Sequence, residues 1–378
     1  MIPLTTVDPV RNSERGSPLR SDKMLQHLDR LASWQAGEMP APVTVELNLT
    51  NSCNHACPGC TFSYLVNKDR SSLPFVMAGH ILSQLAEFGV KAITFSGGGE
   101  PLVYGPDRVL HLMRYARYLG LDVALITNGS LLRDPEFLDL CTWTRVSLDA
   151  YDADTFQRFH GRSEGEFLKV VTNIQEMSSL LLRSDKKRSD LGVGFLTDRQ
   201  SIARCDITKM TNFCLESLPH ISYVQFRPMV TNMVDDSSLT GGYKSFSEEE
   251  YHDIRREVEL SRAIAGDRLR VLWSEEKYAA LSEEGFGRNY KWCHAHFLQA
   301  TIAADGKVYM CCHGQGLEKW CLGDLRDGLF RDIWHSERAN EVKARINPSS
   351  MCPPACRLHS QNRALEGIIN PVEHGNFI

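Results

Sequence analysis

The chain has 378 residues, which is enough for one large domain with an appendage or for two domains. Its 42 basic and 47 acidic residues give a formal net charge of -5, so it lacks the overall basic field that attracts a nucleic-acid backbone. No stretch approaches the ~20 apolar residues of a membrane span, and the N-terminus lacks the apolar core of a secretion signal. We therefore expect a cytoplasmic protein that engages neither nucleic acid nor membrane.

The first 42 residues precede the regular part of the pattern. Residues 1–22 are polar and contain Pro, Ser and Arg, which predicts a disordered tail. Apolar residues at helical spacing predict a short amphipathic helix over residues 23–37. We assign residues 1–42 to this tail and helix.

An alternation of β-rich and helical segments begins at residue 43. The six β-rich runs are residues 43–50, 91–95, 122–126, 145–149, 191–197 and 223–228. Strands that alternate with helices predict a parallel sheet with right-handed crossovers, in an open or closed barrel. Active sites of parallel barrels lie at the C-terminal ends of the strands, so the loops after these runs are expected to converge on one cavity. We assign residues 43–289 to this α/β core.

The pattern changes at about residue 290, after an acidic helix around residues 245–264. The last segment, residues 290–378, holds six of the twelve cysteines, a hairpin-like stretch that turns at Asp305 and Gly306, and one amphipathic helix. Clustered cysteines in a long cytosolic chain favour metal ligation or redox chemistry over disulfides. We predict that residues 290–378 form a second, smaller, metal-stapled domain.

The segment CNHACPGC, residues 53–60, gathers three cysteines in one loop. The thiolates of Cys53, Cys57 and Cys60 can bind three irons of a cubane iron-sulfur cluster, which four cysteines ordinarily close. The fourth iron would keep an open position for a substrate or cofactor, as a catalytic metal does. A zinc site completed by His55 or by a distant cysteine is the alternative interpretation of this segment.

A glycine-rich motif, SGGGEP, follows the second β-rich run and contains Gly98, Gly99 and Glu100. Glycines let the backbone approach a ligand closely, and a carboxylate complements an ammonium group. The three-cysteine loop followed by this GGE motif resembles the radical S-adenosylmethionine (radical SAM) superfamily. The resemblance implies a partial (β/α)6 TIM-type barrel and a [4Fe-4S] cluster that binds SAM. In that family SAM is cleaved to a 5′-deoxyadenosyl radical, which abstracts a hydrogen atom from the substrate.

The same resemblance extends to the ends of the third and fourth β-rich runs, where TNG and SLD contain Asn128 and Ser147. It implies that both residues contact SAM, with Ser147 near the methionine carboxylate or the ribose. Asp149 of the SLD motif could equally cap the next helix. Arg162, or alternatively Arg158, is expected to pair with the carboxylate of SAM in a bidentate fork.

Two further positions concern the walls of the predicted cavity. In the sixth run Gln225 and Arg227 alternate with Val224 and Phe226, so the first pair is expected to face the cavity and the second pair the core. Relatives usually carry an aromatic residue just before the third cysteine of the loop, where this chain has Gly59. The resemblance therefore leaves the stacking of adenine to Phe62 or Tyr64.

A second cysteine set lies in the C-terminal segment and consists of Cys293, Cys311, Cys352 and Cys356. These residues resemble the twitch and SPASM extensions of radical SAM enzymes, which implies one auxiliary [4Fe-4S] cluster with all four positions closed. A closed cluster suits electron transfer or anchoring better than substrate ligation. Zinc is again the alternative. The remaining thiols, Cys312 and Cys321, are candidates for hydrogen-atom donation to a substrate radical, with a small buried residue as the alternative.

The resemblance implies hydrogen-atom abstraction but leaves the substrate open. The first predicted strand begins at residue 43, whereas peptide-modifying relatives frequently carry a leader-binding module before the barrel. We therefore expect a polar small-molecule substrate of aminocyclitol, aminoglycoside or sugar-nucleoside type, which would be dehydrogenated, epimerised, dehydrated or decarboxylated. A flavodoxin or ferredoxin is the expected electron donor. Modification of a ribosomally made peptide is the alternative, and a non-enzymatic zinc-binding or cluster-binding regulator is the alternative from a different class.

Overall fold

The computed structural model describes residues 21–182, 189–230, 246–282, 288 and 290–370. Most of the predicted N-terminal tail therefore lies outside the described residues. The predicted helix over residues 23–37 is divided into a 3-10 helix η2 (Ser21–Gln26) and an α-helix α2 (Leu28–Gln35). No helix among the described residues is long and apolar enough to cross a membrane.

All six predicted parallel strands are present, and each pairs with the next in chain order. Their bounds are β1 (Thr44–Asn48), β2 (Ala92–Ser96), β3 (Asp122–Thr127), β4 (Trp143–Ser147), β5 (Asp190–Thr197) and β6 (Tyr223–Pro228). A seventh parallel strand that the sequence did not predict, β7 (Arg270–Trp273), pairs with β6. The order β1 to β7 confirms a partial barrel of TIM type.

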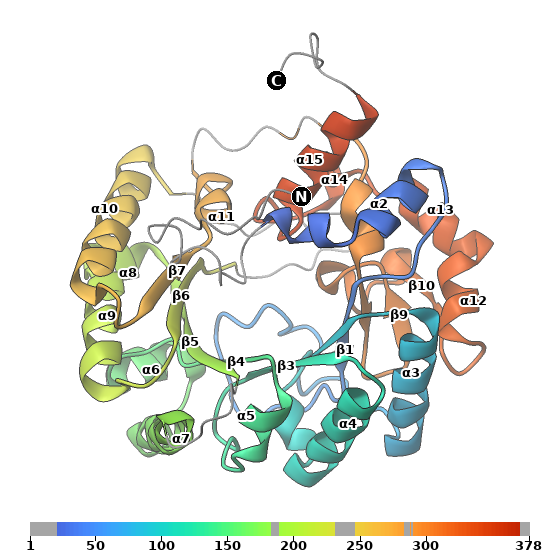
Figure 1. The fold of residues 1–378 in the computed structure, drawn as a ribbon. Helices are drawn as coiled ribbons and strands as arrows, with labels where there is room; N and C mark the ends of the chain where they lie inside the picture. Colours follow the sequence, from blue (N-terminus) through green and yellow to red (C-terminus); the bar gives the residue numbers. More distant parts are fainter. Residues whose placement is uncertain (1–20, 183–188, 231–245, 283–287, 289, 371–378) are drawn as a thin grey trace, which may run out of the picture.

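Helices cover the convex face of this curved sheet (Figure 1). They are α3 (Phe75–Phe88), α4 (Pro106–Tyr118), α5 (Glu136–Leu140), α6 (Ala153–His160), α7 (Glu164–Leu182), α8 (Arg199–Ala203), α9 (Asp206–Ser217) and α10 (Glu248–Ala265). A short 3-10 helix, η3 (Pro101–Tyr104), precedes α4. Each helix packs on the sheet through an apolar face: α3, for example, buries Ala78, Ile81 and Leu82 on one side. It ends at Gly89, whose φ of 101° is the left-handed conformation that favours glycine.

The C-terminal segment continues the same sheet. The predicted hairpin is formed by β8 (Gln299–Ile302) and β9 (Lys307–Tyr309), and β10 (Cys321–Asp324) extends it. Strand β8 also pairs in parallel with β1, so one sheet runs in the order β10-β9-β8-β1-β2-β3-β4-β5-β6-β7. The predicted division at residue 290 therefore does not coincide with a gap in the sheet.

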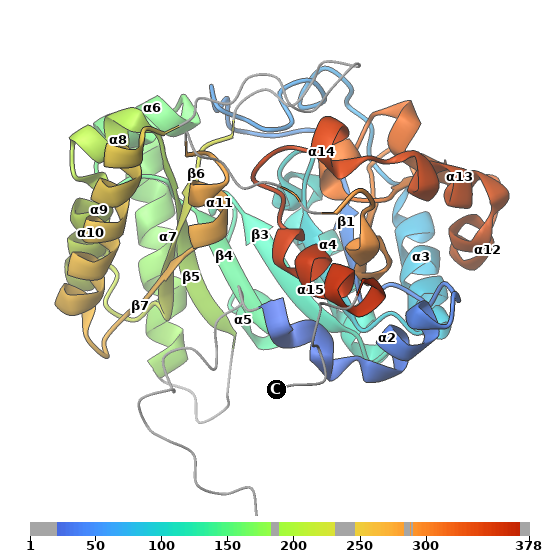
Figure 2. The ribbon, with the colours of Figure 1, turned by 90° about the horizontal axis from the view of Figure 1, so that it is seen from above.

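Short helices of the C-terminal half lie around the far end of the sheet and over its concave side (Figure 2). They are α11 (Glu275–Ala279), η4 (His294–Leu298), η5 (Cys312–Gly314), η6 (Glu318–Trp320), α12 (Phe330–His335), α13 (Glu337–Arg345), α14 (Pro348–Met351) and α15 (His359–Ile369). Helices α12 and α13 lie at the outer side next to α3 and β10, and α11 packs against β6. A separate apolar cluster joins η2 and α2 to η4 and α15 through Met24, Leu31, Phe297 and Leu365. The N-terminal helix is thus packed against the C-terminal segment.

Candidate active site

The loop between β1 and α3 carries the three clustered cysteines, and hydrogen bonds fix both of its ends. Asn51 N donates to Ser71 O at 2.9 Å, and Cys53 N donates to Asn67 Oδ1 at 3.1 Å. In its middle, Ala56 N donates to the carbonyl of His160 at the end of α6 at 3.1 Å. The cysteines are half-buried and line the main cavity, so the loop presents its sulfur atoms to that cavity.

The GGE motif packs directly on this loop. Gly99 N donates to Thr50 O at 3.0 Å, and Glu100 N donates to Ser52 O at 2.9 Å. A Cβ atom on Gly99 would lie 2.1 Å from Ser52 O, and one on Gly98 would lie 2.4 Å from a side-chain oxygen of Asn51. Gly99 is therefore required where two backbones meet, immediately before the first cysteine, whereas Gly98 makes room for the side chain of Asn51.

The buried carboxylate of Glu100 links three segments of the site. It accepts hydrogen bonds from Leu102 N at 3.1 Å, from Thr127 Oγ1 at 2.6 Å and from Asn128 N at 2.7 Å. Burial raises the pKa of Glu100 to about 7, although the three donors oppose the shift. A carboxylate has about four acceptor positions, so one remains for an ammonium group. The predicted contact of Glu100 with SAM stays a proposal.

The sulfur atoms of the loop fit a cluster better than a single metal ion. Within the described residues, those of Cys53, Cys57 and Cys60 do not all lie within 4.8 Å of one another. A tetrahedral zinc ion would hold its sulfur ligands about 3.8 Å apart, given Zn–S bonds of about 2.3 Å. Burial raises the pKa of Cys53 to about 11 and also raises the pKa of Cys57 and Cys60, so these thiols need a bound cation to become thiolates.

His55, the alternative fourth ligand, is already engaged by protein groups. Its Nδ1 lies 3.1 Å from His160 Nδ1, and its Nε2 lies 2.8 Å from Ser130 Oγ. Ligand atoms of His55, Cys57 and His160 do lie within 4.8 Å of one another, which is close enough for a metal ion. However, His160 Nε2 contacts Leu148 O at 3.0 Å, so every ring nitrogen has a partner in the chain. We interpret the two histidines as a satisfied buried pair beside Cys57.

The two residues predicted to contact SAM at the ends of β3 and β4 differ in whether their side chains already bind another part of the protein. Asn128 is buried and bridges to the cysteine loop, because its Nδ2 donates to Asn54 Oδ1 at 2.7 Å. Ser147 is half-buried on the cavity wall. Asp149 accepts from Leu196 N at 2.7 Å and lies near the ring of His160, so it braces strands and does not cap the helix.

Neither arginine of the expected carboxylate fork faces the cavity. Arg162 is exposed, donates to the backbone carbonyl of Asn54 and is absent from the cavity lining of the described residues. Arg158 forms ion pairs with Asp198 at 3.1 Å and with the fully buried Asp206 at 3.0 Å. The structure therefore gives both arginines structural partners, and we leave them out of the proposed SAM site.

The four cysteines of the second set come from three segments: Cys293 precedes η4, Cys311 lies between β9 and η5, and Cys352 and Cys356 belong to the CPPAC segment. Burial raises the pKa of Cys352, and the thiols of Cys356, Cys293 and Cys311 raise it further. The four thiols are therefore close enough to influence one another's ionisation. Within the described residues, no three of them lie within 4.8 Å of one another, so a single zinc ion fits poorly here too. Arg288 donates to the carbonyls of Pro348, Cys352, Pro353 and Pro354 and thereby holds the CPPAC segment.

One large cavity of about 2160 Å³ joins these parts, from the cysteine loop through the barrel to the C-terminal segment. The alternation predicted on β6 is confirmed: Gln225 and Arg227 line the cavity, whereas Val224 and Phe226 are fully buried in the core. Phe62 lines the cavity as well. The remaining candidate for adenine stacking, Tyr64, donates its hydroxyl to Gln315 O at 2.6 Å and so joins the loop to the C-terminal segment.

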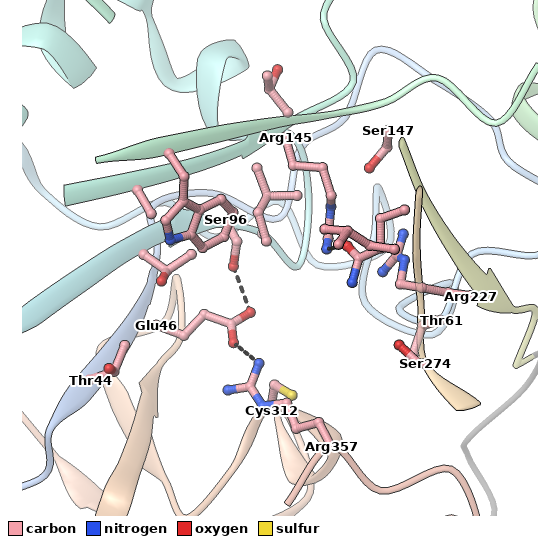
Figure 3. A pocket seen from close by; sticks show the side chains of 18 of the residues that line it. Thr44, Glu46, Thr61, Ser96, Arg145, Ser147, Arg227, Ser274, Cys312 and Arg357 are labelled. Atoms are coloured by element: carbon pink, nitrogen blue, oxygen red, sulfur yellow. Dashed lines mark hydrogen bonds and ion pairs between the residues drawn. The ribbon is translucent and has the colours of Figure 1, made fainter. Parts of the chain in front are cut away.

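Several charged residues of the cavity lining were not predicted from the sequence, and four of them matter for the chemistry of the interior; Figure 3 labels Glu46, Arg145 and Arg357. The four are Glu46 on β1, Arg145 on β4, Lys277 on α11 and Arg357 after the last cysteine. The period-two alternation of β1 and β4 was a usable signal for Glu46 and Arg145, because each lies two residues from another residue of the cavity lining, Thr44 and Ser147 respectively. No local pattern marked Lys277 or Arg357.

The two extra thiols lie in different surroundings. Cys312 lines the cavity, and burial raises its pKa to about 11, whereas Cys321 begins β10 and contacts Gly323 O at 3.6 Å. Cys321 is not part of the cavity lining among the described residues. We therefore keep only Cys312 as a proposed hydrogen-atom donor.

Comparisons with known proteins agree with this arrangement. Residues 47–194 match the sequence model of the radical SAM superfamily, and residues 293–357 match that of SPASM, an iron-sulfur cluster-binding domain. The chain is 35% identical over 333 residues to a PqqA peptide cyclase from Xanthomonas campestris pv. campestris, covering 84% of this chain and 79% of that protein. It is 25% identical over 309 residues to an AdoMet-dependent heme synthase from Methanosarcina barkeri, covering 78% and 83%.

The fold is also that of solved structures. Streptococcus suis SuiB bound to S-adenosylmethionine superposes with a TM-score of 0.61 at 18% identity, over 83% of this chain and 70% of that chain. The chain belongs to the radical SAM superfamily and carries a SPASM domain. It is a radical SAM enzyme, and its cofactors are [4Fe-4S] clusters and S-adenosylmethionine.

Proposed function

We propose that this enzyme modifies a ribosomally made peptide by abstracting a hydrogen atom from one of its residues. The size of the cavity carries the proposal: about 2160 Å³ is more than twice the ~1,000 Å³ at the upper end of small-ligand sites, so a peptide segment fits beside SAM. The similarity to the PqqA peptide cyclase, a relative at 35% identity that covers 84% of this chain, supports it.

The small-molecule substrate expected from the sequence has less support than its alternative. That expectation used the position of the first strand, which carries no information about the cavity. Among the relatives described above, the one with the higher identity acts on a peptide according to its name. The heme synthase keeps a small molecule as the outcome that the experiment must exclude.

The proposed cofactor sites follow from the donor sets. Cys53, Cys57 and Cys60 would hold the cluster that binds SAM, and the second cysteine set would hold an auxiliary cluster. When bound, the first cluster and SAM supply the radical that abstracts the hydrogen atom. The chain itself contributes the GGE loop, with Glu100 positioned for the ammonium group, and Ser147 on the wall where the methionine carboxylate or ribose would lie.

Cys312 is proposed to act on the substrate after the abstraction. Its thiol lines the cavity and stays protonated at neutral pH, since burial raises its pKa to about 11 despite the opposing effect of Arg357. An S–H group in this position can return a hydrogen atom to a substrate radical; the thiyl radical left on Cys312 would then take one electron from the electron donor and one proton to restore the thiol. If Cys312 donates this hydrogen atom, Cys312→Ala should either give a product other than the epimerised peptide or stop the reaction after SAM has been cleaved.

The test is to capture the peptide and follow its chemistry. Anaerobically reconstituted enzyme would be used to enrich binders from a displayed library of randomised short peptides. Enriched peptides would then be incubated with SAM and dithionite, and their mass and the amount of 5′-deoxyadenosine would be measured. We expect a changed peptide mass with wild-type enzyme and with Cys205→Ala, which alters an exposed cysteine, but none with Cys57→Ala. Failure of every enriched peptide to change would refute the proposal.

A further inference from the structure

The interior of the barrel has walls of different charge. On the β1 wall Glu46 forms an ion pair with Arg357 at 2.9 Å and accepts a hydrogen bond from Ser96 Oγ at 2.6 Å (Figure 3). This carboxylate is therefore compensated within the protein. Its bond to Arg357 also links the first strand of the barrel to the SPASM domain.

The opposite wall, formed by β4, β5 and β6, carries two arginines that converge on one glycine. The ideal Cβ position of Gly194 on β5 lies 3.4 Å from Arg227 Nη2 and 3.5 Å from Arg145 Cδ, so both side chains pass over the same point of the wall. Figure 3 shows the two side chains extending into the same part of the cavity. Arg145 donates one hydrogen bond to Gln225 Oε1 at 2.9 Å, and this acceptor is neutral.

Lys277 of α11 adds a third cation to this wall. Burial lowers the pKa of Lys277 to about 8, and Arg227, Arg357 and Arg145 lower it further in that order. Burial, followed by Arg227, lowers the pKa of Arg145 to about 9. Tyr223, Asp149 and Glu46 raise the pKa of Arg145 by less than burial and Arg227 lower it, so the nearby acidic groups do not offset the positive charge of this wall.

In the part of the chain that the structure describes, no carboxylate lies within ion-pair distance of Arg145, Arg227 or Lys277. The buried Nε atoms of both arginines also have no hydrogen-bond partner there. Unpaired cations and unsatisfied donors inside a protein are costly, and arginine pairs most strongly with a carboxylate through two parallel hydrogen bonds. The wall therefore has the donors of a carboxylate site and lacks the carboxylate.

We propose that Arg145, Arg227 and Lys277 form a binding site for a carboxylate of the peptide substrate, from an acidic side chain or from the C-terminus. This inference rests on the proposed function and specifies which peptides it accepts. The carboxylate would anchor the peptide on the β4–β6 wall, and the residue next to it would then face the SAM end of the cavity.

The carboxylate of SAM is a poor candidate for the same site. Ser147, where that carboxylate or the ribose is expected, ends β4, and Arg145 precedes it by two residues on the same face. Two residues of a strand span about 7 Å, so the arginine lies one layer deeper in the barrel. SAM would then bind in the upper layer, at Ser147, and the carboxylate of the peptide would bind in the deeper layer, at Arg145.

The first measurement uses small probes and does not require the natural peptide. Equilibrium dialysis with SAM-loaded enzyme would compare N-acetyl-glutamate α-amide, N-acetyl-glutamine and the neutral N-acetyl-glutamine α-amide. We expect one of the two carboxylates to bind at least tenfold more tightly than the neutral compound, because charged hydrogen bonds have large effects. The preferred probe identifies the side chain or the C-terminus as the source of the carboxylate.

The variants Arg145→Gln and Arg227→Gln should abolish this preference, whereas Arg256→Gln should retain it. Arg256 is a matched control because its side chain on α10 is 80% exposed and pairs with Asp253. Equal binding of all three probes, or a preference that survives in both cavity variants, would overturn the inference. The same holds if Arg145→Gln weakens SAM binding as strongly as probe binding, since the anion would then belong to SAM.

The second measurement separates this inference from the proposed function. Peptides enriched from a library with blocked C-termini, and from one with free C-termini, would be sequenced for wild type and for Arg145→Gln. Enrichment of an acidic position or of free C-termini by wild type alone supports the carboxylate site. Enrichment without either preference overturns the site and leaves the peptide substrate in place. Failure to enrich any peptide removes the peptide and this inference with it, even where the probes bind.

Discussion

Replacement of Gly99 by alanine tests whether the GGE loop must touch the backbone of the cysteine loop. The new Cβ would lie 2.1 Å from Ser52 O and 2.7 Å from Asn51 C, and real Cβ atoms essentially never come within 3.0 Å of a heavy atom beyond their own and the adjacent residues. The two segments must therefore separate by about 1 Å. This shift breaks the hydrogen bonds that Gly99 N and Glu100 N donate to Thr50 O and Ser52 O.

The expected magnitudes follow from these losses. Each backbone hydrogen bond contributes about 1 kcal/mol, so the free energy of unfolding should fall by about 2 kcal/mol. A displacement of about 1 Å at a reacting centre costs about 100-fold in rate, so formation of 5′-deoxyadenosine should fall by that factor. The assays are thermal unfolding, equilibrium dialysis of SAM and quantification of 5′-deoxyadenosine under reducing, anaerobic conditions.

Gly79→Ala provides the matched control. Gly79 lies in α3, and a Cβ atom there would meet nothing within 4 Å. Alanine stabilises a helix interior by about 1 kcal/mol relative to glycine, so this variant should be slightly more stable and fully active. If Gly99→Ala retains the stability and SAM affinity of the wild type, the proposed contact between the two loops is wrong.

Three further predictions concern other parts of the site. Burial and nearby arginines lower the pKa of Lys277 to about 8, so the unfolded chain binds more protons than the folded one between about pH 8 and the ordinary lysine value of 10.5. The stability of the wild type relative to Lys277→Met should therefore rise across that pH window in thermal scans, and a constant difference would contradict this prediction. Cys352→Ser should reduce the iron content from about eight to about four per chain in an iron assay, whereas Cys205→Ser should not. Tyr64→Phe removes the hydrogen bond to Gln315 O and should cost about 1 kcal/mol in denaturant unfolding; an unchanged midpoint would exclude that contribution.

The sequence predicted the parallel part of the fold well because its strands and helices alternate in regular, local patterns. The six strands from β1 to β6 lie within about two residues of the predicted positions, with β4 (Trp143–Ser147) shifted by two from the predicted 145–149, and the hairpin turns at Gly306, whose φ is 85°. Alternation along β6 placed Gln225 and Arg227 on the cavity side, which the structure confirms. In each case the signal lies within a few neighbouring residues.

The remaining features depend on contacts between distant segments, which a local pattern does not contain. The pairing of β8 with β1 joins residues about 250 positions apart, and Lys277 reaches the cavity only because β7 and α11 extend the barrel. Arg162 and Arg158 were plausible as SAM ligands from their positions in the sequence. Their actual partners, Asn54 O and the carboxylates of Asp198 and Asp206, come from other elements.

The pairing of β1 with β8 has a practical consequence for dissecting the protein. Strand β8 pairs with one edge of β1, the strand that leads to the cysteine loop, in a register that runs from Thr44 with Gln299 to Leu47 with Ile302. A fragment ending near residue 289 would leave the N–H and C=O groups of this edge open to pairing with other copies. Such a truncated barrel should aggregate or elute as oligomers in size-exclusion chromatography. The SPASM domain thus also covers the edge of the catalytic barrel, and any shortened version of the protein made for biophysical work should retain it.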